Sequence, residues 1–282
     1  MTDSGFSEGS ILVVAFEGWN DAGESASCTA RALRDQLGLE LLVELDPEDY
    51  FDYQFNRPTV SVDDDGQRML TWPSVCLYGP TDGAPGIYVL LGVEPSRAWK
   101  TFAEEVMDAV EDAGITGIVF LGSMLADVPH TRPIAVSVSS DNAELRREFD
   151  LERSTYEGPV GILSILAVAA EDLGIPSVSV WASVPHYVHN APAPKATLAL
   201  VERLEEFVPI TLDRGTLVEE SVAWESGIDA LAGEDDDMAA YIAQLEQARD
   251  TVDSPEASGE AIAQEFERYL RRRGRQAGDD RP

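Results

Sequence analysis

Residues 156–207 limit the possible folds of this chain more than any other stretch. Their apolar spacing predicts, in order, a helix, a strand over 177–184, a loop with two histidines, and a second helix. Hardly any spacer separates these elements, as is typical of a crossover unit. Right-handed crossovers return helices to the faces of a mostly parallel sheet. We therefore expect a three-layer α/β/α domain with a mostly parallel or mixed sheet, and this unit at the centre of that sheet.

The N-terminal part predicts a second unit of strand, turn and helix. The apolar and β-branched run 11–16 is typical of a strand that is buried on both faces. The loop 17–23 follows, and Asn20 or Asp21 can cap the next helix by accepting from free backbone N–H groups. One stripe of that helix is expected to be buried, with Ala30, Leu33 and Leu37. Such a unit places its loop at the carboxyl edge of the sheet.

Further elements follow the same alternation. Strands are predicted over 41–45, 87–93, 118–121 and 134–138, and helices over 96–112 and 141–149. The loop 122–133 is expected at the same edge as the loop 17–23. Residues 46–56 alternate acidic and aromatic side chains, which favours an ordered loop over disorder. The turn signal at 64–66, between 59–63 and 67–72, predicts a hairpin on an edge of the sheet.

The chain changes character after Pro209, because its apolar residues then take helical spacing only. Three amphipathic helices are predicted, with stripes at 217–231, 238–245 and 262–269. The sequence therefore divides into a three-layer α/β domain over 1–209, a helical extension over 210–274, and a flexible tail over 275–282.

Composition limits the partners and the compartment. The 282 residues carry a formal net charge of -32, which repels phosphate backbones and anionic lipid, so we expect neither nucleic acid nor a membrane as partner. No signal peptide or membrane-spanning run is recognised. The two cysteines are too few for a disulfide framework, which fits a reducing cytosol. A cytoplasmic protein is expected.

No catalytic or metal-binding constellation is recognised. Ser123 follows a strand, but the surrounding FLGSML is not a G-x-S-x-G nucleophile elbow, and no adjacent base is recognised. His186 and His189 are three residues apart in a loop, but no H-E-x-x-H helix or paired carboxylate motif supports a metal site, so hydrogen bonding on the surface or in the core is favoured. The loop at Trp19–Gly23 lacks the lysine of a phosphate-binding loop, and simple helix capping explains it better. We expect no cofactor and no metal, and we lean against an enzyme.

Lys195 is the most unusual of the candidate residues. The chain has only two lysines, and this one stands at a predicted helix start, where the helix dipole disfavours a cation. Glu157, a carboxylate of a partner chain or a ligand could hold it, whereas a solvated lysine is the simpler interpretation.

Four blocks of the sequence resemble the proteasome assembly chaperone family of the second-subunit type, in its actinobacterial branch. They are FEGWNDAG, VPHTRP, YEGPVGI and VPHYVHNAPAPKATLAL, which stand in this order between residues 16 and 200. The resemblance implies a phosphorylase/hydrolase-like domain and a non-catalytic chaperone. In eukaryotic and archaeal members it also implies docking on the proteasome α-ring by a C-terminal hydrophobic-tyrosine-any tripeptide. This chain ends in Asp280-Arg281-Pro282, so we expect that its tail does not dock in that way.

Two functions follow from these observations. The first is a non-catalytic assembly or interaction protein that associates with itself as a homodimer or homotrimer, with a proteasome-related or other assembly as a possible partner. The alternative is a small-molecule-binding protein or a hydrolase- or phosphorylase-like enzyme that uses the loops at the carboxyl edge. Both predict that the loops beginning at 17, 123, 156 and 185 share one edge. The candidate ligand or partner residues are Glu17, Asn20, Asp21, Ser123, Asp127, His130, Tyr156, Glu157, His186, Tyr187 and Lys195.

Overall fold

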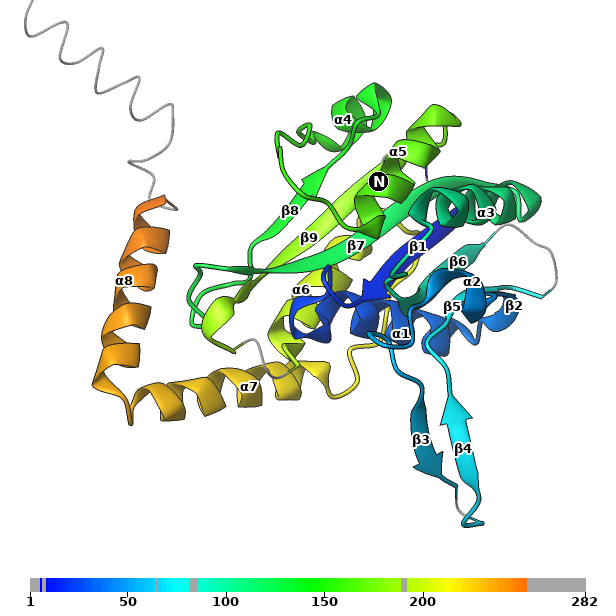
Figure 1. Ribbon diagram of the computed structural model, residues 1–282. Helices are drawn as coiled ribbons and strands as arrows, with labels where there is room; N and C mark the ends of the chain where they lie inside the picture. The colour runs from blue at the N-terminus through cyan, green and yellow to red at the C-terminus, as the bar shows by residue number, and fades with distance from the viewer. Residues whose placement is uncertain (1–5, 7–8, 64, 82–85, 189–191, 253–282) are drawn as a thin grey trace, which may run out of the picture.

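A computed structural model of the chain describes residues 6, 9–63, 65–81, 86–188 and 192–252. The predicted third helix of the extension, the tail and His189 lie outside these residues. Within them, the structure has the expected α/β/α architecture, with two further helices at the C-terminal side (Figure 1). None of the described helices is long and apolar enough to cross a membrane.

The main sheet has seven strands in the order β2-β5-β6-β1-β7-β9-β8. Their bounds are Glu40–Leu45 for β2, Val75–Gly79 for β5, Ile87–Val93 for β6, Ser10–Glu17 for β1, Ile115–Ala126 for β7, Ser177–Pro185 for β9 and Val136–Ser139 for β8. β1, β6, β7 and β9 are parallel, whereas β5 runs antiparallel to β6, β2 to β5 and β8 to β9. The sheet is therefore mixed.

The predicted position of the 177–184 strand at the centre of the sheet is wrong. β1 is central, and β9 lies next to the edge strand β8. The burial patterns show the reason: seven of the eight residues of β1 are buried, whereas burial in β9 alternates as in a strand with one less covered face.

Two hydrophobic clusters lie on opposite faces of the sheet. Ile11, Val13 and Ala15 of β1 face α1 (Ser25–Leu37) and α6 (Pro194–Leu204). The alternate residues Leu12, Val14 and Phe16 face α3 (Trp99–Asp112) and α5 (Ile162–Asp172). Of the predicted stripe of α1, Ala30 and Leu33 are buried, but Leu37 is exposed at the helix end.

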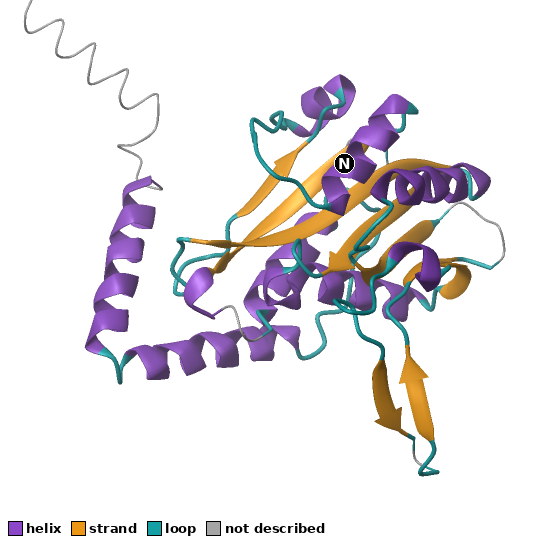
Figure 2. Cartoon of the chain, viewed as in Figure 1, coloured by secondary structure: helices purple, strands orange, loops and turns teal. Residues whose placement is uncertain are grey.

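The hairpin does not lie on an edge of the main sheet, so this prediction was wrong in its placement. β3 (Thr59–Val62) and β4 (Arg68–Thr71) pair only with each other and project from the domain (Figure 2). The preceding segment is ordered as expected: it contains the short helix α2 (Pro47–Tyr50), and Tyr50 and Phe51 are buried. The strand β5, which lies between β2 and β6 in the sheet, was not predicted.

The C-terminal helices form an arm rather than a compact bundle. α7 (Leu217–Ala232) packs on α6 and continues away from the domain, and α8 (Asp236–Val252) turns sharply from its end (Figure 1). The remaining elements are α4 (Ala143–Phe149) and two short 3-10 turns, η1 (Ala22–Glu24) and η2 (His186–Val188).

Candidate functional site

The loops of the candidate site meet at the carboxyl edge of the sheet, as predicted. The parallel strands β1, β7 and β9 end at Glu17, Ala126 and Pro185 on this edge. The loop before α5 reaches the same place, because the backbone N–H of Ile162 contacts a carboxylate at the end of β6. In open α/β sheets this edge is where ligands usually bind.

The loop after β1 is held on β7 by the protein's own hydrogen bonds. The N–H of Ser123 donates to the Asn20 carbonyl at 2.8 Å, and the Ser123 hydroxyl donates to the Ala22 carbonyl at 2.9 Å. Ser123 belongs to β7, which extends beyond the predicted strand end at Leu121, so its prediction as a loop residue was wrong. Its side chain is fully buried, which leaves the hydroxyl without access to a substrate.

Asp21 has the predicted capping role. Its Oδ1 accepts from the N–H groups of Ala26 and Ser27 at 2.8 and 3.1 Å, at the start of α1. Burial raises the pKa of the Asp21 carboxyl, although the hydrogen bonds from Ser27 and Ala26 act in the opposite direction. Glu17 forms an ion pair with Arg31 of α1. Both acids therefore serve the junction of β1 with α1.

A third carboxylate, that of Glu94, fills the position at the start of α5 where an anion could bind. Its Oε1 accepts from the buried Asn20 amide at 3.0 Å and from the Ile162 N–H at 2.9 Å. A negative charge at this helix N-terminus is favoured by the free N–H groups and the helix dipole. Glu94 was missed in the sequence, although it follows β6 at the same edge as the other candidates.

Replacing Glu94 by leucine is expected to lower the free energy of unfolding by about 2 kcal/mol, because it leaves two donors without their acceptor. Glu94→Gln keeps the accepting oxygen and is expected to cost about 1 kcal/mol or less, through the lost charge at the helix N-terminus. Urea unfolding of the three proteins measures both values. Equal losses in the two variants would contradict the role assigned to the oxygen.

The second group of candidates surrounds His130, which is fully buried. The His130 backbone N–H donates to the Tyr187 hydroxyl at 2.7 Å, so that hydroxyl is free to donate to Nδ1, at 2.9 Å. Nε2–H then donates to Asp229 of α7, at 3.1 Å. Burial raises the pKa of Tyr187 to about 12.

Lys195 also contacts the arm. Its Nζ donates to the His130 carbonyl at 2.6 Å and forms an ion pair with Glu225 of α7. Lys195 is therefore not a solvated lysine, and its partner is not Glu157. Both of these interpretations were wrong. The sequence could not place Glu225 beside a residue thirty positions earlier.

The end of β7 and the loop after it hold α8. Asp127 lies 3.3 Å from the Tyr241 hydroxyl and from His186 Nδ1. Arg132 forms a bidentate pair with Asp250, with both distances 2.8 Å, and a further ion pair with Glu246. The candidates Asp127, His130, His186, Tyr187 and Lys195 thus meet at one junction with the arm. None of their contacts from α7 and α8 was predicted.

Tyr156 and Glu157 join neither group. Both are exposed, and the Tyr156 hydroxyl donates to the Pro159 carbonyl at 2.9 Å within its own loop. Other exposed apolar side chains stand on the same loops and strand ends. They are Trp19, Met124, Leu125 and Val160. The accessible surface at this edge therefore includes apolar and aromatic side chains, which are common in protein contact surfaces.

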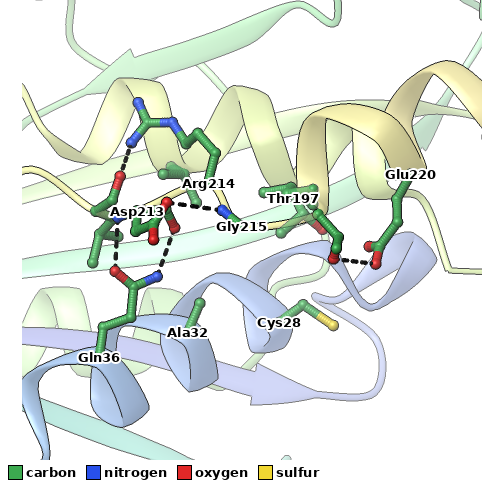
Figure 3. A pocket seen from close by; sticks show the side chains of 12 residues that line it. Cys28, Ala32, Gln36, Thr197, Asp213, Arg214, Gly215 and Glu220 are labelled. Atoms are coloured by element: carbon green, nitrogen blue, oxygen red, sulfur yellow. Dashed lines mark hydrogen bonds between the residues drawn. The ribbon is translucent and has the colours of Figure 1, made fainter.

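A separate shallow pocket of about 260 Å³ lies between α1, α6 and the segment before α7 (Figure 3). Its polar groups bond to one another: Gln36 exchanges two hydrogen bonds of 2.7 Å with the Asp213 backbone, and Thr216 donates to Glu220. Burial raises the pKa of the Cys28 thiol on its wall, which disfavours the reactive thiolate. Nothing in this pocket pairs a nucleophile with a base.

Taken together, the fold and the edge define an α/β/α protein whose candidate polar groups Asn20, Glu94 and Ser123 hydrogen-bond to one another or to the backbone. The described residues contain no group of three or more side chains suited to hold a metal ion. A model of the PAC2 family matches residues 15–232, so the chain belongs to the PAC2 family.

Solved structures of actinobacterial proteins are similar over most of the chain. A PAC2 family protein from Streptomyces avermitilis is 43% identical, with a TM-score of 0.75, over 82% of this chain and 98% of that one. A proteasome-assembly chaperone homologue from Mycobacterium tuberculosis is 38% identical, with a TM-score of 0.73, over 82% of this chain and 99% of that one. These similarities agree with the resemblance seen in the sequence.

The fold extends to archaeal proteins. PbaA of Pyrococcus furiosus, an archaeal homolog of proteasome-assembly chaperone, is 18% identical with a TM-score of 0.57, over 86% of this chain and 95% of that one. At this identity the similarity shows the fold alone. Among the curated proteins, none matches the chain.

Proposed function

We propose that this PAC2 family member is a non-catalytic assembly or interaction protein that associates with itself in the cytoplasm. The observation that carries the proposal is the hydrogen bonding of the polar groups at the carboxyl edge. The Asn20 amide donates to Glu94, which also accepts from the Ile162 N–H. The Ser123 hydroxyl donates to a backbone carbonyl. A reaction site needs such groups to be directed at a substrate.

The alternative, a small-molecule binder or a hydrolase- or phosphorylase-like enzyme, is not favoured. Its best nucleophile, Ser123, is buried and donates to a backbone carbonyl. Its best base, His130, is buried between Tyr187 and Asp229. Both side chains are fully buried, so neither is accessible to a substrate that approaches from solvent.

Protein partners fit the accessible surface better. The exposed side chains at the edge include Trp19, Met124 and Tyr156, and aromatic residues and methionine are enriched in protein interfaces. The Mycobacterium tuberculosis relative is a proteasome-assembly chaperone homologue, at 38% identity. A proteasome-related assembly is therefore included in the proposal as a second partner beside another copy of the chain.

The proposal keeps the division into an α/β domain over 1–209 and an extension over 210–274. The extension contributes α7 and α8, which contact the 127–132 segment, η2 and Lys195. In this arrangement the candidate residues around His130 have a positioning role: they hold the arm on the domain. The candidates around Asn20 join the loop after β1 to β7 and to Glu94.

Native mass spectrometry of the purified chain at micromolar concentration tests the proposal in one measurement. A dimer or trimer without additional bound mass is expected. Because Debye screening at about 0.15 M salt confines repulsion to charges near the contact, association is expected to weaken when the salt is lowered. A monomer at both salt concentrations would contradict self-association. A stoichiometric small molecule retained by the protein would favour the alternative function.

A further inference from the structure

The projecting hairpin carries most of its apolar side chains on one face. In the register of β3 with β4, Val60 is opposite Leu70 and Val62 is opposite Arg68, and directly opposite residues point to the same face. The other face carries Thr59, Ser61, Met69 and Thr71. Trp72 follows Thr71 and continues the alternation onto the side of Leu70. We call Val60, Val62, Leu70 and Trp72 the apolar hairpin face.

The apolar hairpin face is exposed to solvent in the single chain. The exposed fractions of its side chains are 50% for Val60, 67% for Val62, 61% for Leu70 and 45% for Trp72. Alternation of this kind is typical of a sheet with one buried face, and an isolated two-stranded hairpin is at best marginally stable in water. The pattern therefore implies that another surface covers this face.

We propose that the apolar hairpin face of one copy packs on the same face of a second copy, around a twofold axis near the Val60–Leu70 pair. This inference rests on the self-association proposed above and assigns a surface to it. Two such hairpins lie antiparallel, so the tip of each meets the base of the other.

Charge and ring chemistry favour a second copy as the occupant. Arg68 lies towards the tip and Trp72 at the base, so antiparallel packing places the guanidinium of each copy over the indole of the other. Within one chain, Arg68 forms no ion pair with the described residues.

The base of the hairpin is prepared for such a contact. The Trp72 ring packs on Tyr53, with 4.9 Å between the ring centroids, so its orientation is fixed before association. Phe55, which precedes β3 by four residues, is 81% exposed. The surface remains small beside the roughly 800 Å² per partner of a standard interface, so a dissociation constant on the order of micromolar is expected.

A pair of aspartate variants on neighbouring residues tests the inference. Leu70→Asp places a charge inside the proposed contact and is expected to raise the dimer dissociation constant about 100-fold or more. Thr71→Asp adds the same charge to the opposite face and is expected to change it less than about threefold. Sedimentation equilibrium of the full chain gives the constants, and circular dichroism checks that each variant keeps its fold.

A reversed charge probes the ends of the contact. Arg68→Glu is expected to weaken the dimer about tenfold, because it removes the cation over the partner's indole. If folded Leu70→Asp associates as the original chain does, the hairpin assignment is wrong, while self-association through another surface stands. Equal losses in Leu70→Asp and Thr71→Asp would also overturn the assignment to the apolar face. If the unmodified chain is a monomer, both proposals fail.

Discussion

Gly92→Ala is expected to destabilise the fold by on the order of 3 kcal/mol, because the added methyl group has no space. Gly92 lies in β6 opposite Val75 of β5. A Cβ at this position would overlap the Ser74 carbonyl oxygen and lie 2.6 Å from the Val75 Cα. Both are backbone atoms, so relief requires a shift of the strand. That shift would also strain the hydrogen bond from the Val93 N–H to the Ser74 carbonyl.

Gly117→Ala provides the matched control in β7. Its Cβ would also come within 2.6 Å of an atom, but that atom belongs to the Phe6 side chain, so relief requires no shift of a paired strand. A loss of about 1 kcal/mol or less is expected for this variant. Thermal unfolding compares the two, and a difference of about 2 kcal/mol corresponds to roughly 4–8 °C in Tm for a chain of this size. Similar unfolding midpoints for the two variants would show that β5 and β6 can move apart at a smaller cost than the backbone contacts around Gly92 imply.

Replacing His130 by alanine is expected to cost about 3 kcal/mol and to loosen the arm. The substitution leaves a cavity at a fully buried position and removes the ring that joins Tyr187 to Asp229. Amide hydrogen exchange should therefore rise in α7 before it rises in the central strands. Urea unfolding gives the loss of stability.

Asp229→Ala separates the ring from its partner on the arm. The Asp229 side chain is 58% exposed, so water can replace part of its interaction with His130. A cost of about 1 kcal/mol or less is expected for this variant. If it destabilises the protein as much as His130→Ala, the effect arises from the hydrogen bond to the arm and not from the packing of the ring.

The sequence predicts the layers of this protein better than it predicts the order of the strands in the sheet. Continuous apolar runs such as 11–16 and 87–93 identify buried strands, because a strand covered on both faces has no polar side. The position of each strand in the sheet depends on pairings far apart in the chain. The 177–184 strand was therefore predicted at the centre of the sheet, whereas in the structure it pairs with the short edge strand β8.

In the candidate site, too, some contacts could be predicted from the sequence and others could not. Asp21 is recognisable as a cap because its partners are five and six residues away. Glu94 could have been found by the rule that places strand ends at one edge. The pairing of Lys195 with Glu225 could not, because the position of α7 on the domain is set by packing and not by local pattern. The exposed face of the hairpin follows from its register, which the turn signal at 64–66 fixes.

The arm is also the last described part of the chain to be made. Synthesis from the N-terminus completes β9, the last strand of the sheet, at Pro185, and α6 at Leu204, before α7 begins at Leu217. Domains generally fold as units during synthesis. The sheet can thus form before Asp229 and Glu225, the partners of His130 and Lys195, have been synthesised. Closure of this junction would then mark the late stage of folding, when the newly made chain acquires its final surface.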